Sequence, residues 1–321
     1  TAEARKLVDE IITEAYRNRD RTFGNARFVN DLIEKAKVAL GLRIMKNPHL
    51  RDPSRDDLSS ILPEDIMAIK ALEDFTSPII PVDEKLLELS LAELNALTGL
   101  DGVKKQIKEM IDIVRYHQTI GRGVLNKFYM HTVFIGNPGT GKTTVARILT
   151  RIYKSLGILE RGHMVETDRQ GLVAGYVGQT ALKTAEKIDE AMGGVLFIDE
   201  AYALTNSSGN AHDFGNEVIQ TILKRMEDKR GQFFVFAAGY PDNMEAFLKA
   251  NPGLSSRFDK VLRFEDYSPE ELNEIAIHMI QAQEMRITPK ALEHLTAYFK
   301  ILYDYRDKYF GNARSIRQTI Q

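Results

Sequence analysis

The pattern of hydrophobic and polar positions changes character along this 321-residue chain. Between residues 130 and 265, short apolar runs alternate with longer stretches whose apolar residues recur every three or four positions. Short continuous runs are typical of strands buried on both faces, and the longer pattern is typical of amphipathic helices. Five runs are predicted strands: 132–135, 164–167, 195–198, 233–238 and 261–264. This alternation predicts an α/β fold, with a parallel five-stranded sheet that carries helices on both faces.

The flanking regions have only helical patterns. Residues 86–96 and a stretch that begins near Val103 predict helices before the first strand. After Asp266, Ser268-Pro269-Glu270-Glu271 fits a capping box with proline at the first helical position, and Thr288-Pro289 begins another helix. We therefore expect an α/β domain over 86–267 and an all-helical lid over 268–321.

A repeat links the two ends of the chain. Residues 16–27 return as residues 303–314, and the core Phe-Gly-Asn-Ala-Arg is identical in both copies. The first copy continues through a helical stretch to Gly41, whereas the second reaches only Gln321. The repeat predicts that 1–45 is the helical remnant of a preceding module's lid, that 46–85 is a connector, and that the lid at 268–321 is truncated. Residues 1–45 are then either an independent leftover or a segment that packs on 268–321 and completes this lid.

Composition narrows the possible functions. Lys and Arg total 43 against 45 Asp and Glu, so the near-neutral balance disfavours a dedicated nucleic-acid surface. The absence of cysteine excludes disulfides and thiolate metal sites and fits a reducing compartment. No apolar run approaches the length of a membrane span, and residues 1–5 do not resemble a signal peptide. We expect a cytoplasmic protein without a membrane segment.

One motif indicates phosphate binding. It runs Gly136-Asn137-Pro138-Gly139-Thr140-Gly141-Lys142-Thr143 and fits G-x-x-x-x-G-K-[ST], with a predicted strand before it and a predicted helix after it. Its glycines allow backbone N–H groups to point at a polyphosphate, and the N-terminus of the helix adds partial positive charge. Lys142 is expected to reach the β- and γ-phosphates and Thr143 to bind Mg²⁺, with Thr144 also at the nucleotide. A glycine-rich turn without a ligand would not account for this strand–loop–helix context.

A second motif indicates hydrolysis. Asp199 and Glu200 directly follow the apolar run 195–198. The carboxyl ends of parallel strands form the ligand-binding edge of a sheet, so both carboxylates should face the phosphate loop. We expect Asp199 to hold the magnesium shell and Glu200 to orient and deprotonate the attacking water. The alternative is a solvated acidic turn after a core strand.

Together these motifs and the Gly-Asn-Ala-Arg segment resemble AAA+ ATPases over roughly residues 86–321. Within this family, its sequence is most similar to the subgroup of CbbX, stage V sporulation protein K and EccA. Three segments carry this closer resemblance: Leu172–Thr180, Ala237–Tyr240 and Asn251–Phe258. The resemblance implies hydrolysis of ATP with Mg²⁺ in a homo-oligomeric, hexameric ring that acts on a protein client.

The resemblance also implies roles for single residues. Tyr176-Val177-Gly178 would form a pore loop that grips polypeptide; the alternative is an ordinary core or loop tyrosine. Arg257 would be an arginine finger that reaches a neighbouring subunit's nucleotide; the alternative is a surface arginine that pairs with a nearby carboxylate. Arg314 would be the lid arginine that contacts its own subunit's nucleotide, with Arg27 at the same position in the first copy.

Two further positions concern the nucleotide and the water. The turn with Leu100 and Gly102 corresponds to the part of the family that encloses adenine. Many family members end the fourth strand with an Asn or Thr that positions the attacking water. This chain has Ala238-Gly239-Tyr240 there, with Asn243 three residues later, so the sequence leaves this position open.

The sequence thus predicts an ATP-driven motor that remodels or translocates proteins. Two alternatives remain. One is a nucleotide-switched assembly scaffold with little turnover, and the other is a nucleic-acid loader, which the near-neutral charge disfavours.

Overall fold

The structure is a computed structural model. It describes residues 1–17, 25–46, 58–75, 82–119, 130–176, 178–205, 214–258, 260–308 and 310–320. The chain divides into two compact units, Thr1–Pro78 and Ile79–Gln321. Each unit is described by itself.

A five-stranded sheet forms the centre of the second unit. Its order is β2-β3-β4-β1-β5, and every neighbouring pair is parallel. The strands are β1 (Thr132–Gly136), β2 (Met164–Thr167), β3 (Val195–Ile198), β4 (Phe234–Gly239) and β5 (Lys260–Phe264). The predicted parallel sheet is therefore confirmed, with strand ends that differ by at most one residue.

Alternating side chains of the strands build two hydrophobic cores. Phe134, Phe197 and Phe236 belong to the core on one face of the sheet, whereas Val133 and Val235 belong to the core on the other. The first core packs against α5 (Glu84–Ala96), α6 (Asp101–Thr119) and α7 (Lys142–Ser155). The second packs against α8 (Arg169–Leu172), α9 (Thr180–Glu190), η1 (Ala201–Leu204), α10 (Phe214–Asp228), α11 (Pro241–Ala250) and α12 (Pro252–Ser255).

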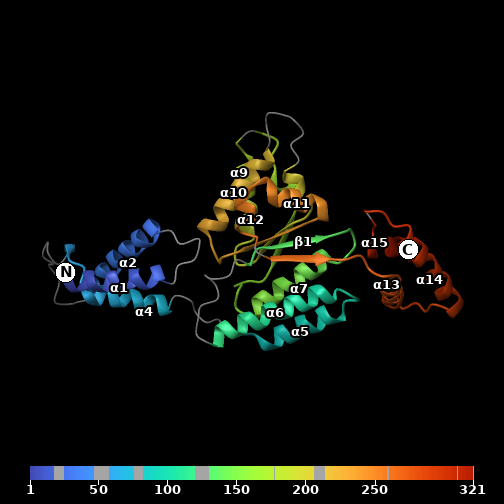
Figure 1. The fold of residues 1–321 in the computed structure, drawn as a ribbon, viewed down its shortest axis with the longest axis horizontal. Helices are drawn as coiled ribbons and strands as arrows, with labels where there is room; N and C mark the ends of the chain where they lie inside the picture. The colour runs from blue at the N-terminus through green and yellow to red at the C-terminus, as the bar shows by residue number, and fades with distance from the viewer. Residues whose placement is uncertain are drawn as a thin grey trace. The chain divides into compact units, whose positions relative to one another are not determined.

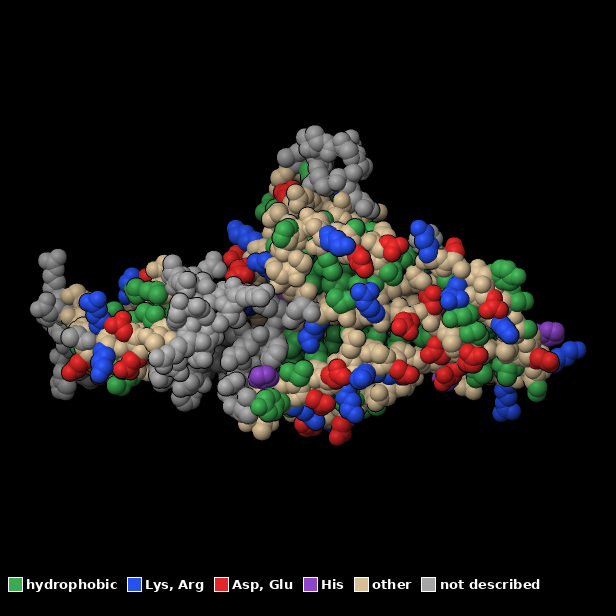
Figure 2. All heavy atoms as spheres, in the orientation of Figure 1, with side chains coloured by type: hydrophobic (Ala, Val, Ile, Leu, Met, Phe, Trp, Pro, Cys, Tyr) green, Lys and Arg blue, Asp and Glu red, His purple; other side chains and the backbone are tan. Residues whose placement is uncertain are grey.

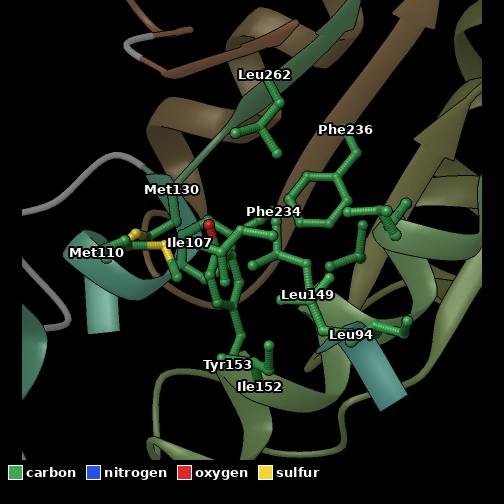
Figure 3. Packing of buried hydrophobic residues seen from close by; sticks show 14 of the residues in the cluster. Leu94, Ile107, Met110, Met130, Leu149, Ile152, Tyr153, Phe234, Phe236 and Leu262 are labelled. Atoms are coloured by element: carbon green, nitrogen blue, oxygen red, sulfur yellow. The ribbon is translucent and has the colours of Figure 1, made fainter. Parts of the chain in front are cut away.

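Figures 1 and 3 show this layering. In Figure 1, α5, α6 and α7 lie along one side of the sheet, and α9 to α12 lie along the other. In Figure 3, Phe234 and Phe236 of β4 meet Leu149 and Tyr153 of α7. Complete burial of one such side chain contributes roughly 1.5–3 kcal/mol, so the two cores hold β1, β3 and β4 rigidly in place. The loops that follow the carboxyl ends of these strands are therefore anchored to rigid strands.

A helical lid follows β5, as the sequence predicts. It consists of α13 (Pro269–Gln281), α14 (Pro289–Asp304) and α15 (Ala313–Ile320). The predicted capping box is present, because Glu271 N donates to Ser268 Oγ at 3.2 Å and Ser268 N donates to the Glu271 carboxylate at 2.7 Å. The lid has its own small core around Leu272, Phe299 and Ile316.

The first unit is a cluster of three described helices, α1 (Ala2–Arg17), α2 (Asn25–Lys46) and α4 (Pro63–Phe75). Ile66 and Ile69 of α4 are each 1% exposed and pack in one core with Leu32 of α2. Arg43 of α2 also pairs with the buried Asp65 of α4 at 2.8 Å. The unit thus extends past residue 45, where we expected a connector, because the apolar face of α4 needs a packing partner.

The surface carries charge of both signs. On the face seen in Figure 2, Lys and Arg side chains are interspersed with Asp and Glu over the second unit. Among the described residues, no helix is long and apolar enough to cross a membrane.

Candidate active site

The phosphate loop joins β1 to α7 and has the backbone that its glycines predict. Gly139 and Gly141 have φ angles of +72° and +87°, in the left-handed region that favours glycine. Gly141 is the residue before the first turn of α7, so the free N–H groups of that helix open towards the loop. Thr140 Oγ1 donates to Asn137 O at 2.8 Å and closes the turn from within.

Lys142 lies near the C-terminal end of the phosphate loop, and its side chain reaches back to the first residues of the loop. Its Nζ atom donates to Gly136 O at 2.8 Å and to Asn137 O at 2.7 Å. The pKa of Lys142 is lowered to about 8, mainly by burial; the charge of Asp199 opposes this shift, and the charge of Arg314 contributes to it. The amine is therefore held by two backbone carbonyls of the phosphate loop.

Asp199 and Glu200 follow β3 at the carboxyl edge of the sheet. Asp199 N donates to Thr167 O at 2.8 Å, and Glu200 N donates to Asp199 Oδ1 at 3.0 Å. Glu200 has φ 49° and ψ 43°, a left-handed conformation that is strained for a residue with a side chain. Both carboxylates are exposed to the pocket, as the sequence predicts for this edge.

A pocket of about 560 Å³ contains these groups, and its size is typical of a small-molecule site. It is lined by residues of the phosphate loop, the strand ends, the turn before α6 and the lid. The described lining residues are Ala96, Leu97, Thr98, Leu100, Pro138, Gly139, Gly141, Lys142, Thr143, Thr144, Asp199, Glu200, Gly239, Tyr240, Tyr267, Ile275, His278, Met279, Ala282, Ala313, Arg314 and Arg317. The sheet domain and the lid therefore share one site.

The oxygen donors in the pocket fit a magnesium ion. Thr143 offers a hydroxyl and Asp199 a carboxylate, and Mg²⁺ binds through one or two protein oxygens together with substrate phosphates and water. These two side chains are the ones that the sequence assigns to the metal.

Most of the predicted nucleotide residues line this pocket, but Gly136, Asn137 and Thr140 of the phosphate loop do not, and neither does Gly102. It is exposed in the first turn of α6 and is not among the described lining residues, whereas Leu100 is. Leu100 has φ 61°, which turns the backbone so that only one end of the predicted turn faces the pocket.

The remaining predicted residues lie outside this pocket or outside what the structure describes. Arg257 does not line the described pocket of its own chain, and its guanidinium contacts Glu227 Oε2 at 3.2 Å. Tyr176 is 74% exposed on the loop after α8. Val177 lies outside the described residues, and the side chain of Arg27, at the start of α2, also lies outside what the structure describes.

Sequence reasoning missed the residues that join the lid to the loop. Asp266, Tyr267 and Asn312 form a hydrogen-bonded group against the phosphate loop. Burial raises the pKa of Tyr267 to about 12, so its hydroxyl remains a donor, and it donates to Thr140 O at 3.3 Å. The repeated Phe-Gly-Asn-Ala-Arg core contained a signal for Asn312, but no sequence pattern marked Asp266.

The sequence leaves open which residue at the end of β4 would position the attacking water, and Tyr240 follows that strand directly. Tyr240 lines the pocket, and its ring lies 5.7 Å from that of Tyr202, whereas Asn243 is exposed on α11. Burial, followed by the charge of Glu200, raises the pKa of Tyr202. A protonated Tyr202 therefore lies beside Glu200, and Tyr240 lies beside Tyr202.

We expect the affinity for ATP to fall as the pH rises above 8. The pKa of Lys142 in the empty site is about 8. A bound polyphosphate favours the charged amine, so binding above pH 8 takes up a proton, and each pH unit weakens affinity by up to about tenfold. Titration of a fluorescent ATP analogue between pH 7 and 10 measures this. Lys142→Arg should remove the dependence, because guanidinium stays charged; an unchanged slope in that variant would assign the proton to another group.

Comparisons with known proteins agree with this geometry. The family model described as "ATPase family associated with various cellular activities (AAA)" matches residues 132–266. The model "AAA lid domain" matches residues 1–75 and 268–321.

Curated relatives match most of the chain. It is 40% identical to "Stage V sporulation protein K" of Bacillus subtilis over 232 residues, which cover 71% of each protein. It is 44% identical to "Protein CbbX" of Cereibacter sphaeroides over 70% of this chain and 72% of that protein. It is also 40% identical to the Mycobacterium tuberculosis "ESX-1 secretion system protein EccA1", over 74% of this chain and 43% of that protein.

One solved structure shares the fold. The structure titled "Crystal structure of FIGL-1 AAA domain in complex with ADP" aligns with a TM-score of 0.50 at 19% identity, over 70% of each chain. At this identity the likeness concerns the fold.

Proposed function

The chain belongs to the AAA+ ATPases, in the group of stage V sporulation protein K, CbbX and EccA, and from this premise we propose that it works as a ring-shaped motor that remodels or translocates a protein client. It is an ATPase that converts ATP and water to ADP and phosphate. The ring, the client and the individual residue roles are the proposed part.

The observation that carries the proposal is the convergence of cationic and acidic groups in one pocket. Lys142, Asp199, Glu200 and Arg314 all line it. Lys142 binds the β- and γ-phosphates, and Asp199 with Thr143 holds the Mg²⁺ that neutralises the charge which develops on them. Glu200 orients and deprotonates the attacking water.

The position of Arg257 supports a ring. A finger stabilises the charge of the transferred phosphoryl group, so it must reach a γ-phosphate. Arg257 does not line the described pocket of its own chain, and Glu227 holds its guanidinium at 3.2 Å. We propose that Arg257 acts in a neighbouring subunit's pocket, so that assembly, in the hexamer that the family resemblance implies, completes the site.

The loop that follows α8 supports a polypeptide client. Tyr176 is 74% exposed, and no atom within 4 Å would meet a Cβ placed on Gly175 or Gly178. An exposed aromatic ring between unhindered glycines can contact many side chains without strict sequence preference. The base of the loop is fixed, because Lys183 of α9 donates to Val173 O at 2.8 Å.

We expect Tyr176→Ala to separate ATP hydrolysis from work on a client. Basal turnover should stay within about twofold, since the ring lies outside the pocket, whereas stimulation of turnover by a permanently unfolded protein should be lost. Steady-state ATPase assays with and without that protein measure both quantities. Tyr305→Ala is the matched control, because Tyr305 is also highly exposed but lies at the end of α14. Equal stimulation of wild type and Tyr176→Ala would contradict the proposed loop role.

The scaffold alternative predicts negligible turnover in the wild-type chain, so the same assay excludes or supports it. The nucleic-acid alternative predicts DNA binding whose affinity falls steeply with salt. The mixture of charges on the surface in Figure 2 favours the protein client.

We also propose that the first unit, which begins with residues 1–45 and extends through α4, is the lid end of a preceding module. The match of the lid-domain model to residues 1–75 and the repeated Phe-Gly-Asn-Ala-Arg core support this.

Arg314→Ala should then weaken nucleotide binding or hydrolysis, whereas Arg27→Ala should leave both unchanged, because the P-loop that Arg27 would serve belongs to the preceding module. Parallel measurements of the dissociation constant and turnover check this. Comparable losses in both variants would instead show that residues 1–45 complete this module's lid.

A further inference from the structure

Asn312 is the buried centre of the contact between the lid and the phosphate loop. Its side chain is fully buried, and its backbone has a φ of 46°. Its Oδ1 accepts Tyr267 N at 2.9 Å, and its Nδ2 donates to Asp266 Oδ1 at 2.8 Å and Phe310 O at 3.0 Å. A third contact from Nδ2, at 3.3 Å, reaches Pro138 O in the phosphate loop.

Asp266 links Asn312 of the lid to the phosphate loop. The same oxygen, Oδ1, also accepts Asn137 Nδ2 at 2.9 Å. One carboxylate oxygen therefore holds an amide of the phosphate loop and an amide of the lid at once. Hydrogen bonds to a charged acceptor are stronger than neutral ones, so Asp266 is a strong link between the two parts.

The backbones at this contact also touch. Ala313 N donates to Gly139 O at 3.2 Å. A Cβ on Gly139 would lie 2.2 Å from Gly311 O and 2.7 Å from Arg314 N, so only glycine allows this approach. The next side chain along the lid, Arg314, points into the pocket as a lining residue.

We propose that Asp266 and Asn312 are positioning residues that fix Arg314 relative to the bound phosphates. The inference rests on the proposed role of Arg314 at the nucleotide. The side chain of Arg314 is exposed and flexible, so it loses conformational entropy when it contacts phosphate. The buried Asn312, two residues earlier, fixes the backbone of Arg314 and thereby reduces that loss. Through Asn137, the same carboxylate ties that backbone to the loop that holds the phosphates.

The proposal gives a physical reason for each residue of the repeated core. Phe310 packs in the lid core, a Cβ on Gly311 would lie 2.4 Å from Ser315 Oγ within the lid, and Asn312 is the anchor. Ala313 N closes the backbone contact, and Arg314 faces the nucleotide.

A double-mutant cycle separates positioning from simple support of the fold. The variants are Asp266→Ala, Arg314→Ala and the double variant, and the readout is the dissociation constant for a non-hydrolysable ATP analogue. Each single variant should weaken binding about tenfold, as expected for the loss of one hydrogen bond to a charged group. The double variant should be no weaker than Arg314→Ala, because Asp266 acts through Arg314.

Two further variants complete the test. Asp266→Asn keeps an oxygen that can accept both amides, so it should restore affinity to within about threefold of wild type, although it lacks the charge. Asp304→Ala removes an exposed lid carboxylate at the end of α14 and should leave affinity unchanged. Thermal unfolding of every variant measures its loss of stability. A purely structural role would lower stability, but the effects of the two substitutions on binding would then not be non-additive.

The outcomes are distinguishable. If Arg314→Ala binds the analogue as tightly as wild type, the proposed role of Arg314 fails and this inference fails with it. If Arg314→Ala weakens binding but Asp266→Ala does not, or if the two losses multiply in the double variant, only the positioning role is overturned.

Discussion

Replacing Arg257 with alanine should lower ATP turnover by about 10³–10⁵-fold, the range for arginine fingers in other P-loop enzymes. The affinity for ATP should change by only a few-fold, because Arg257 does not line the described pocket of its own chain. Steady-state turnover and nucleotide titration measure the two effects. Arg263→Ala, which removes an exposed arginine of the nearby β5, is the control and should behave as wild type.

A mixing experiment decides whether Arg257 acts on a neighbouring subunit. Lys142→Ala supplies an intact finger with a defective pocket, and Arg257→Ala supplies the reverse. Some interfaces in mixed rings then pair an intact pocket with an intact finger, so the mixture should be more active than the sum of its components. If no ratio exceeds that sum, Arg257 acts within its own subunit or has no role in hydrolysis.

The second large effect concerns the division of roles between Lys142 and Glu200. Lys142→Ala should weaken ATP binding by about 100-fold or more, because it deletes a cation that forms charge-assisted hydrogen bonds with two phosphates. Glu200→Gln should keep binding close to wild type and lower turnover by about 10²–10⁴-fold, because glutamine preserves shape but cannot take a proton. Fluorescent nucleotide titration and phosphate-release assays measure the two quantities.

Matched controls exist for both substitutions. Lys154→Ala removes an exposed lysine from the same helix, and Glu160→Gln neutralises an exposed carboxylate outside the pocket. Both should leave binding and turnover unchanged. Equal loss of binding in Lys142→Ala and Glu200→Gln would contradict the separate roles.

Much of the fold could be predicted because its signals are local. The apolar runs of β1 and β3 mark strands, and the loop glycines allow the positive φ angles that Gly139 and Gly141 adopt. The Asp-Glu pair after β3 reaches the pocket because the carboxyl ends of parallel strands share one edge.

The missed features depend on contacts between distant residues. Asp266 is separated from Asn137 by 129 positions and from Asn312 by 46, so no periodicity or motif links them. The sequence predicts a connector over 46–85 because the short helical pattern of α4 lies between polar and proline-rich stretches. Its partner, Leu32 of α2, is distant in sequence and becomes visible only in the packed core.

The left-handed backbone conformation of Glu200 lowers the stability of the fold at a position that we propose is needed for activity. A side chain in that conformation costs about 1–2 kcal/mol, whereas glycine adopts it without strain. Glu200→Gly should therefore unfold at a higher temperature than the wild-type chain even though it has lost the base. A search for more stable variants of this ATPase by heat resistance alone would select against the residue that we propose as the base for the attacking water.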